Sequence, residues 1–233
     1  MTIIRISVPK LCLSIFAVHY LYNMDKYEQS AQTWNSLARI YEEKFMHLDY
    51  YNESYDIFCE LVDKEDAAIL ETGSGPGNIC HYILQKHPGW KWLGTDVAPA
   101  MVELANNNNP AAHFEVMDAR DIAKIDRSFD GIISGFCLPF LSQEDCSRFF
   151  KDSNLLMPGK GVLYLSFVEG NYEDSTLKTG STGQSTYFHY HPMPVIEAQL
   201  QEAGFTVSKV MHVQFKRNES DSETHTIVVA VKG

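Results

Sequence analysis

The 233-residue chain has little of what disulfide frameworks, metal centres and nucleic-acid surfaces require. Its five cysteines form no CxxC pair, and its nine histidines form no HExxH motif. We therefore expect reduced thiols, a cytoplasmic location and no metal site. No run of Lys or Arg exceeds two residues and the formal net charge is −11, which argues against a nucleic-acid partner and favours a small-molecule substrate.

The first 23 residues contain a short apolar run that is typical of a targeting signal. Residues 11–18 follow Arg5 and Lys10, as in the core of a signal peptide. No small-residue cleavage pattern follows, and the run is too short to span a bilayer. We interpret residues 1–23 as an extension upstream of Met24, and we expect one domain over residues 24–233 with no membrane contact.

What the chain does have is a glycine loop directly after an apolar strand, in the run AAILETGSGPGNIC at residues 67–80. Gly73, Gly75 and Gly77 let the backbone turn sharply and let a ligand approach the main chain. A strand, a glycine turn and a helix place a nucleotide-like ligand at the carboxyl edge of a parallel sheet. The dinucleotide fingerprint needs a further glycine where this chain has Asn78. A nicotinamide-dependent oxidoreductase is therefore a disfavoured alternative.

Three successive strands end in or just before a carboxylate, namely Glu71, Asp96 and Asp118. An ionised carboxylate only accepts hydrogen bonds, so Asp96 suits the hydroxyls of a ribose. The acidic rim would repel a pyrophosphate and favours a ligand that carries positive charge and adenosine. In the alternative interpretation, the glycines are plain turn residues, Asp96 starts a helix and Asp118 caps a turn.

Four segments together resemble motifs I to IV of the class I S-adenosylmethionine-dependent methyltransferases: ETGSGPG, GTDVAPAMVELA, VMDARD and FDGIISGFCLPFL. The resemblance runs from about residue 34 to the C-terminus. It implies a Rossmann-like, doubly wound, seven-stranded α/β sheet that is mostly parallel, with helices on both faces. It further implies S-adenosyl-L-methionine as cofactor and methyl transfer to an O or N atom of a small molecule. A cofactor-binding protein without catalysis remains an alternative.

The resemblance also assigns parts of the cofactor to successive strand ends. Glu71 would face the amino group of the methionine part, Asp96 would bind the ribose, and Asp118 would read the adenine edge. Phe136 and Cys137 would lie beneath the sulfonium, although Cys137 by itself is typical of a small buried hydrophobe. The further cofactor contacts expected are Tyr41, Gly73, Ser74, Gly75, Val97, Met101, Ala119 and Gly135.

Hydrophobic periodicity predicts alternating helices and strands along the chain. Helices are expected over 26–48, 53–64, 77–86, 99–107, 142–157 and 195–203, and strands over 67–71, 91–96, 113–117, 129–135, 162–168, 206–215 and 225–232. The short polar connection between the last two strands predicts an antiparallel hairpin. Cap helices at about 26–64 are expected to cover the site, and the family resemblance implies that Trp34 or Tyr41 closes over the cofactor.

The acceptor side of the site is expected in a substrate-side insertion at about 169–192, with a flexible loop at 179–183. The period of two residues in a strand places Tyr187, His189 and His191 on one face. Because an acceptor oxygen or nitrogen must lose a proton, His189 or His191 is the candidate base; the alternative is a lid strand with histidines at the surface. The predicted acceptor contacts are Trp34, Leu138, Tyr187 and His189. We expect a monomer or a homodimer.

Deletion of residues 1–23 tests the interpretation of the leading segment. We expect the shortened chain to keep the cofactor affinity of the full chain, because every motif that carries the resemblance lies beyond residue 33. Titration calorimetry with S-adenosylmethionine on both chains measures this. Loss of affinity in a folded shortened chain would contradict the interpretation.

Overall fold

The computed structural model describes residues 25–180, 182–216 and 222–233, so the interpretation of residues 1–23 lies outside the described part. Its centre is a seven-stranded sheet in the order β3-β2-β1-β4-β5-β9-β8. The first five strands in this order are parallel, and β9 pairs antiparallel with both β5 and β8. The strands are β1 (Ala68–Thr72), β2 (Lys91–Asp96), β3 (His113–Val116), β4 (Gly131–Gly135), β5 (Val162–Val168), β8 (Phe205–Lys216) and β9 (Ser222–Lys232).

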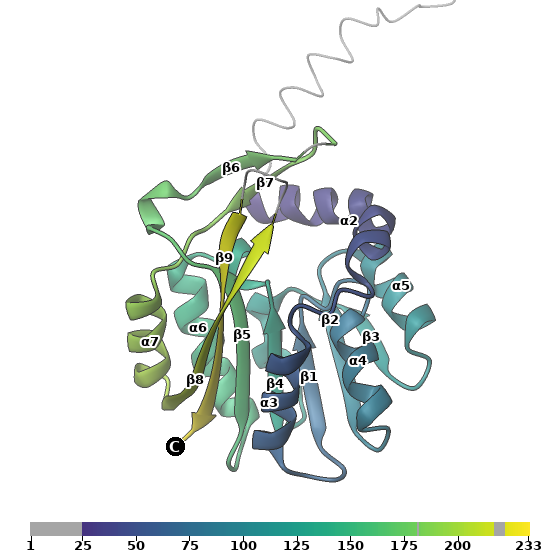
Figure 1. Cartoon of the computed structure of the whole chain (residues 1–233), viewed down its shortest axis with the longest axis vertical. Coiled ribbons are helices and arrows are strands. Elements are labelled where there is room, and N and C mark those ends of the chain that lie inside the picture. Colours follow the sequence, from purple (N-terminus) through teal and green to yellow (C-terminus); the bar gives the residue numbers. More distant parts are fainter. Residues whose placement is uncertain (1–24, 181, 217–221) are drawn as a thin grey trace, which may run out of the picture.

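Helices cover both faces of the sheet (Figure 1). On one face, Phe58, Ile79 and Val102 belong to a core with the strands; on the other, Phe149 and Ile196 do so. The helices of the first face are α3 (Asn52–Val62), α4 (Asn78–Lys86) and α5 (Pro99–Asn108), and those of the second are α6 (Gln143–Leu156) and α7 (Met193–Glu202). Short 3-10 turns are η1 (Ala119–Lys124), η2 (Leu138–Phe140) and η3 (Tyr172–Asp174).

Burial along the strands follows from this layering. All seven residues of β5 are buried, because helices pack on both of its faces, as is usual for parallel sheets. The edge strand β8 instead alternates exposed and half-buried positions along most of its length. The sheet therefore has a dry centre whose strand ends can hold polar groups without exposing the core.

A roof covers the carboxyl ends of the central strands. It consists of α2 (Lys26–Phe45) and a separate antiparallel pair, β6 (Thr176–Thr179) and β7 (Ser185–Phe188). Figure 1 shows α2 lying across the top of the sheet, with β6 and β7 beside it. The hydroxyl of Thr33 in α2 donates to the carbonyl of Ser185, and Thr186 donates to Ser30. These bonds tie β7 to α2.

The predicted fold class and the terminal hairpin are confirmed by the strand order and pairing. Two predictions of local structure need correction. The strand expected to carry Tyr187, His189 and His191 ends at Phe188, and the first helix ends at Phe45 instead of residue 48. The strand β6 was not predicted, because its sequence TLKT is short and three of its four residues are polar. Part of the predicted loop at 179–183 falls on residue 181, outside the described residues.

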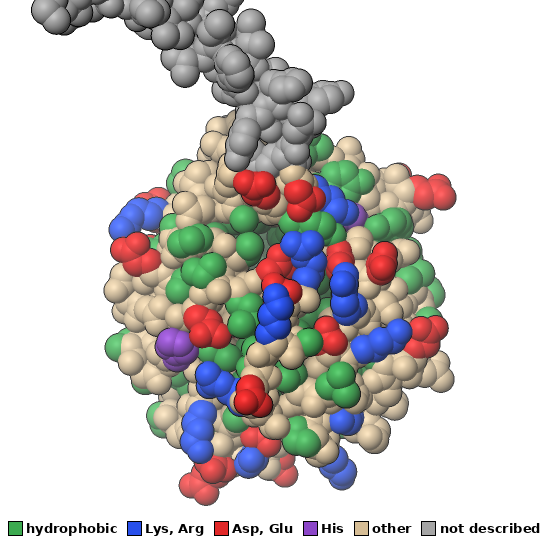
Figure 2. Space-filling model, turned by 180° about the vertical axis from the view of Figure 1, so that it is seen from behind, with side chains coloured by type: hydrophobic (Ala, Val, Ile, Leu, Met, Phe, Trp, Pro, Cys, Tyr) green, Lys and Arg blue, Asp and Glu red, His purple; other side chains and the backbone are tan. Residues whose placement is uncertain are grey.

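One face of the molecule shows how the surface charges are distributed. On the face shown in Figure 2, acidic and basic side chains are interspersed. Within the described residues, no helix combines the length and the apolar character needed to cross a membrane.

The N-terminus of α6 provides a test of local stability. The Ser142 hydroxyl accepts from the Asp145 N–H at 3.1 Å, in a capping box. We expect Ser142→Ala to lower the free energy of unfolding by about 1 kcal/mol, which for a chain of this size is a fall in Tm of about 2–4 °C. Thermal unfolding followed by circular dichroism measures it.

Ser147→Ala is the matched control, because Ser147 lies inside the same helix, past the cap. Alanine is favoured at helix-interior positions, so this variant should unfold at or above the Tm of the unchanged protein. Equal falls in Tm for both variants would contradict the capping argument.

Candidate functional site

A cavity of about 570 Å³ lies between the roof and the carboxyl ends of the central strands. Every residue predicted above to contact the cofactor lines it, from Tyr41 in the roof to Cys137 after β4. Trp34, one of the predicted acceptor contacts, lines it too. The structure thus brings together residues that are spread over about 100 positions of the sequence.

The glycine loop approaches the cavity with its backbone. Gly73 and Gly75 both have positive φ, at 63° and 53°, in the left-handed region that glycine adopts without strain. A Cβ at Gly73 would lie 3.0 Å from the Cβ of Cys137, so a larger residue would push the loop after β1 away from the end of β4. The loop therefore offers bare main chain to a ligand.

Asp96 joins the loops that follow β1 and β2. One carboxylate oxygen accepts from the Gly75 N–H at 2.9 Å and the other from the Ala98 N–H at 2.8 Å. The side chain is 8% exposed, and burial raises its pKa although the backbone N–H groups of Ala98, Gly75 and Val97 oppose this. Asp96 therefore ends β2 and lines the cavity, while the N-cap of α5 is Ala98, so the alternative interpretation that Asp96 starts the helix is wrong.

Glu71 carries a buried carboxyl group with one unsatisfied oxygen. Its Oε2 accepts from the Trp92 indole N–H at 3.1 Å, and its Oε1 has no hydrogen-bond partner among the described residues. Burial raises the pKa of Glu71 to about 8; the Trp92 bond lowers it and the charge of Asp96 raises it further. A buried acceptor without a donor costs free energy, so this position favours a ligand that supplies N–H groups.

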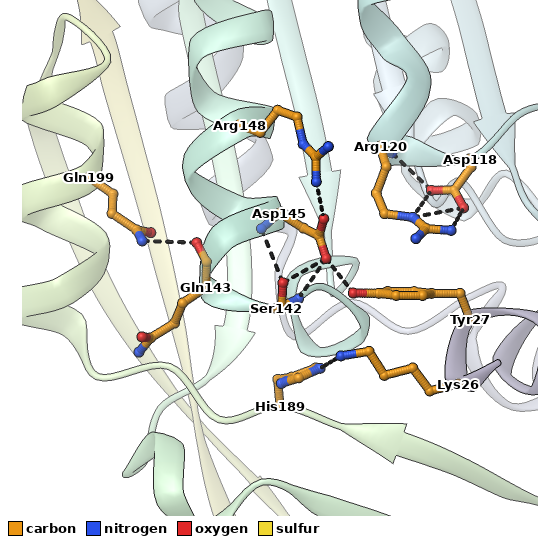
Figure 3. Close-up of polar contacts among 10 residues, drawn as sticks. All are labelled: Lys26, Tyr27, Asp118, Arg120, Ser142, Gln143, Asp145, Arg148, His189 and Gln199. Carbon is orange, nitrogen blue, oxygen red and sulfur yellow. Dashed lines mark hydrogen bonds and ion pairs between the residues drawn. The ribbon is translucent and has the colours of Figure 1, made fainter.

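Asp118 is held by its own turn and by the roof (Figure 3). Its carboxylate accepts from the Arg120 N–H at 2.9 Å and from the Arg120 guanidinium, with a shortest contact of 2.6 Å. The guanidinium carbon lies 3.6 Å from the centre of the Tyr27 ring, and the Tyr27 hydroxyl donates to Asp145. Asp118 therefore caps a turn, as the alternative interpretation expected, and also lines the cavity.

Phe136 occupies a strained backbone position at the end of β4. Its φ is 53°, which is uncommon for a residue with a Cβ. The Phe136 N–H donates to both the carbonyl and the hydroxyl of Ser166, at 3.1 and 3.0 Å, which holds the conformation in place. Strain of this kind gathers at functional sites, and here it aims the ring into the cavity.

The predicted base histidines need correction. His189 and His191 lie beyond the end of β7, are 3% and 0% exposed, and do not line the cavity. His189 lies 3.4 Å from the Lys26 ammonium, and His191 Nε2 lies 2.9 Å from the carbonyl of Leu138. Burial, followed by the Lys26 charge, lowers the pKa of His189 to about 4, and burial lowers that of His191. Both side chains are buried beside the roof and outside the cavity, so their position contradicts the predicted catalytic role.

Two predicted acceptor contacts are also misplaced. Tyr187 lies on the strand face away from the cavity, where its hydroxyl donates to the Ser175 carbonyl, and Leu138 is fully buried in the core beneath α6. The opposite face of β7 lines the cavity with Thr186 and Phe188. The period of two was right, but pairing with β6 and packing on α2 turned the other face inward.

Several residues that line the cavity were not predicted from the sequence. Tyr51 precedes α3, Phe215 lies in β8 and His225 lies in β9, and all three line the cavity. No local motif marks them. The antiparallel register of β9, which sets His225 beside Val168 at the end of β5, is the one feature that could have placed His225 at this edge.

The described residues contain no candidate metal site. Between residues 25 and 233, apart from 181 and 217–221, no group of three or more His, Cys, Asp or Glu side chains is placed to hold an ion. Cys59, Cys80, Cys137 and Cys146 are free thiols. Burial raises the pKa of the Cys137 thiol to about 12, so it lines the cavity as an uncharged group.

Solved structures share this fold. The magnesium protoporphyrin IX methyltransferase of Synechocystis PCC 6803, solved with bound SAM, matches with a TM-score of 0.65 at 15% identity, covering 90% of this chain and 98% of that one. The 1,6-didemethyltoxoflavin-N1-methyltransferase of Burkholderia thailandensis matches with a TM-score of 0.63 at 16% identity, covering 99% and 93%. At these identities the likeness shows the fold.

Sequence comparison adds the family. The family model described as a methyltransferase domain matches residues 69–161, which run from β1 to the residue before β5. A trans-aconitate 2-methyltransferase of Variovorax paradoxus is 28% identical over 143 residues, 60% of this chain and 52% of its own length. The chain spans about half the length of the first curated relatives it matches. The family match places a methyltransferase domain over residues 69–161, and the motifs and the sheet order resemble those of the class I S-adenosylmethionine-dependent methyltransferases.

Proposed function

We propose that this protein binds S-adenosyl-L-methionine in the cavity and transfers its methyl group to an O or N atom of a small molecule. The observation that carries the proposal is the unsatisfied Oε1 of Glu71 at one end of a cavity whose floor is bare glycine backbone. A ligand that carries both an ammonium group and adenosine would supply a donor to Glu71 and could lie against the glycine backbone.

The residues fit this cofactor part by part. Glu71 would accept from the ammonium of the methionine part, and the loop at Gly73 and Gly75 leaves room beside it. Asp96, on the next strand end, would accept from the ribose hydroxyls, while Asp118 and Ala119 line the cavity one strand further along. The order of these groups along the sheet edge matches the order of groups in the molecule.

Bound S-adenosyl-L-methionine supplies an electrophilic methyl group on a sulfonium. The chain contributes position and exclusion of water, and positioning alone can contribute on the order of 7–11 kcal/mol to lowering a barrier. Tyr41 covers Gly75 from above, and its ring packs edge-on against Trp34. Burial raises the pKa of Tyr41 to about 12, so its hydroxyl stays uncharged over the cavity.

A small acceptor is supported by the enclosure of the site. Trp34 and Phe188 of the roof each make an edge-to-face contact with Phe140 of η2, at 5.3 and 6.0 Å between ring centres. Such a wall suits an apolar or aromatic molecule better than a macromolecule. The net charge of −11 further disfavours a polyanionic acceptor.

We place the protein in the cytoplasm, because its four described cysteines are free thiols. The proposal treats residues 24–233 as one domain, with the segment at about 169–192 as the acceptor-side insertion. A monomer or a homodimer fits this arrangement equally.

The first test removes a cofactor contact. We expect Asp96→Ala to weaken S-adenosylmethionine binding more than tenfold, because the ribose loses a charged acceptor worth roughly 1.5–3 kcal/mol. Titration calorimetry measures the Kd. Asp121→Ala is the matched control, since Asp121 pairs with Lys124 at the surface; equal affinity in the two variants would count against the proposed site.

The second test uses the pKa of Glu71. At about pH 6 the buried carboxyl group, whose pKa is raised to about 8, is mostly protonated. Binding of an ammonium needs the carboxylate and so expels a proton, and affinity should rise with pH, approaching tenfold per unit. The rise should stop at about pH 8, where the ligand's own α-amino group begins to lose its proton.

Calorimetry in two buffers of different ionisation enthalpy measures the proton release directly. Glu71→Gln should bind more weakly and without this pH dependence, because the amide does not titrate. An unchanged pH slope in Glu71→Gln would show that another group takes part in the proton exchange.

A further inference from the structure

A chain of three polar side chains ends at the cavity on the side of α3 and β9. The Tyr51 hydroxyl lies 2.7 Å from His225 Nδ1, and His225 Nε2 lies 3.0 Å from the Glu223 carboxylate. All three residues line the cavity. Tyr51 is 7% exposed and His225 is 6% exposed, so the contacts are shielded from bulk water.

The direction of these hydrogen bonds follows from their chemistry. A carboxylate only accepts, so His225 Nε2 carries the proton that points to Glu223. The neutral imidazole then has an acceptor at Nδ1, and Tyr51 must donate to it. With its one proton committed, the Tyr51 oxygen can only accept from a group in the cavity. This position therefore selects a hydrogen-bond donor.

Aromatic rings surround the imidazole and fix its plane. Phe215 stacks on His225 at 4.8 Å with an angle of 13° between the planes, and Phe136 meets it edge-on at 4.6 Å. Phe136 also contacts the Tyr51 ring at 5.3 Å. Ring faces of this kind stabilise an imidazolium by cation–π interaction, and aromatic rings that line the cavity suit a planar ligand, which can stack on them.

We propose that Tyr51, His225 and Glu223 form a proton relay that deprotonates a planar hydroxyl acceptor of the phenol or enol class. This inference rests on the proposed function, which places Phe136 beside the sulfonium. The acceptor O–H donates to the Tyr51 oxygen. As the acceptor oxygen forms its bond to the methyl carbon, the carbon–sulfur bond breaks and its electron pair stays on sulfur. The acceptor proton passes to Tyr51, and the Tyr51 proton passes to His225 Nδ1.

The two remaining members have different roles. Glu223 accepts from the imidazolium and holds the tautomer, so it is a positioning residue that acts through His225. Tyr51 is held in place by its backbone, because its carbonyl accepts from both the N–H and the hydroxyl of Ser54. Burial raises the pKa of Tyr51 well above its usual range, so Tyr51 passes a proton on without becoming a stable anion.

The test uses 4-nitrophenol, whose phenolate absorbs visible light, as a probe for proton transfer at equilibrium. It is added to the protein saturated with S-adenosylhomocysteine, so that no methyl group is transferred. We expect about tenfold more of the bound probe in the phenolate form than of the free probe at the same pH. Tyr51→Phe and His225→Gln should abolish this enrichment while the Kd for S-adenosylhomocysteine stays within about twofold.

Tyr50→Phe is the matched control, because Tyr50 is adjacent, 54% exposed and outside the cavity lining; it should keep the full enrichment. With S-adenosylmethionine, methylation of the probe should have a kcat about 10²-fold lower in Tyr51→Phe and His225→Gln. Enrichment that persists in Tyr51→Phe, or a probe that does not bind saturably, overturns the relay. Failure of the unchanged protein to bind S-adenosylhomocysteine overturns instead the proposed function on which the relay rests.

Discussion

The two hydrogen bonds that the Asp96 carboxylate accepts organise the whole site. They fasten the glycine loop after β1 to the start of α5 after β2, from inside the protein, where such charge-assisted bonds are strong. With the loop held there, Gly75 lies against the Tyr41 ring and Gly73 against Cys137. The floor, the roof and the end of β4 are therefore positioned relative to one carboxylate, and a change in it reaches all three.

The roof depends on polar contacts made at one end of α2. Tyr27 reaches Asp145 at the N-terminus of α6, and its ring receives the Arg120 guanidinium that also holds Asp118 (Figure 3). A residue expected to read the cofactor is thereby linked to the helix that covers it. Beneath the same end, Lys26 lies beside the neutral imidazole of His189. The contacts that hold α2 over the cavity and those that hold Asp118 therefore belong to one network.

In the proposed function, buried acidity would make the site selective for its ligand. Glu71 is forced by burial to keep a proton that a bound ammonium would displace, so the cavity favours a cationic ligand over water. On the far side, in the relay that we propose, the Tyr51 hydroxyl donates to His225 and offers only an acceptor to the cavity. The two ends of the cavity would therefore bind different groups, a cation at Glu71 and a hydrogen-bond donor at Tyr51. The methyl group would be transferred between these two ends.

The sequence by itself determined the sheet, the glycine loop and the acidic strand ends, because these depend on local periodicity and on residues that adjoin in the chain. Glu71, Asp96 and Asp118 could be placed at one edge since parallel strands share their direction. Tertiary structure decided which face of β7 met the cavity, because its pairing with β6 and its contact with α2 set the rotation of the strand. As a result His189, predicted to face the acceptor, lies away from the cavity. It also decided the pairing of Tyr51 with His225, which lie 174 residues apart and meet only through the register of β9 on β5.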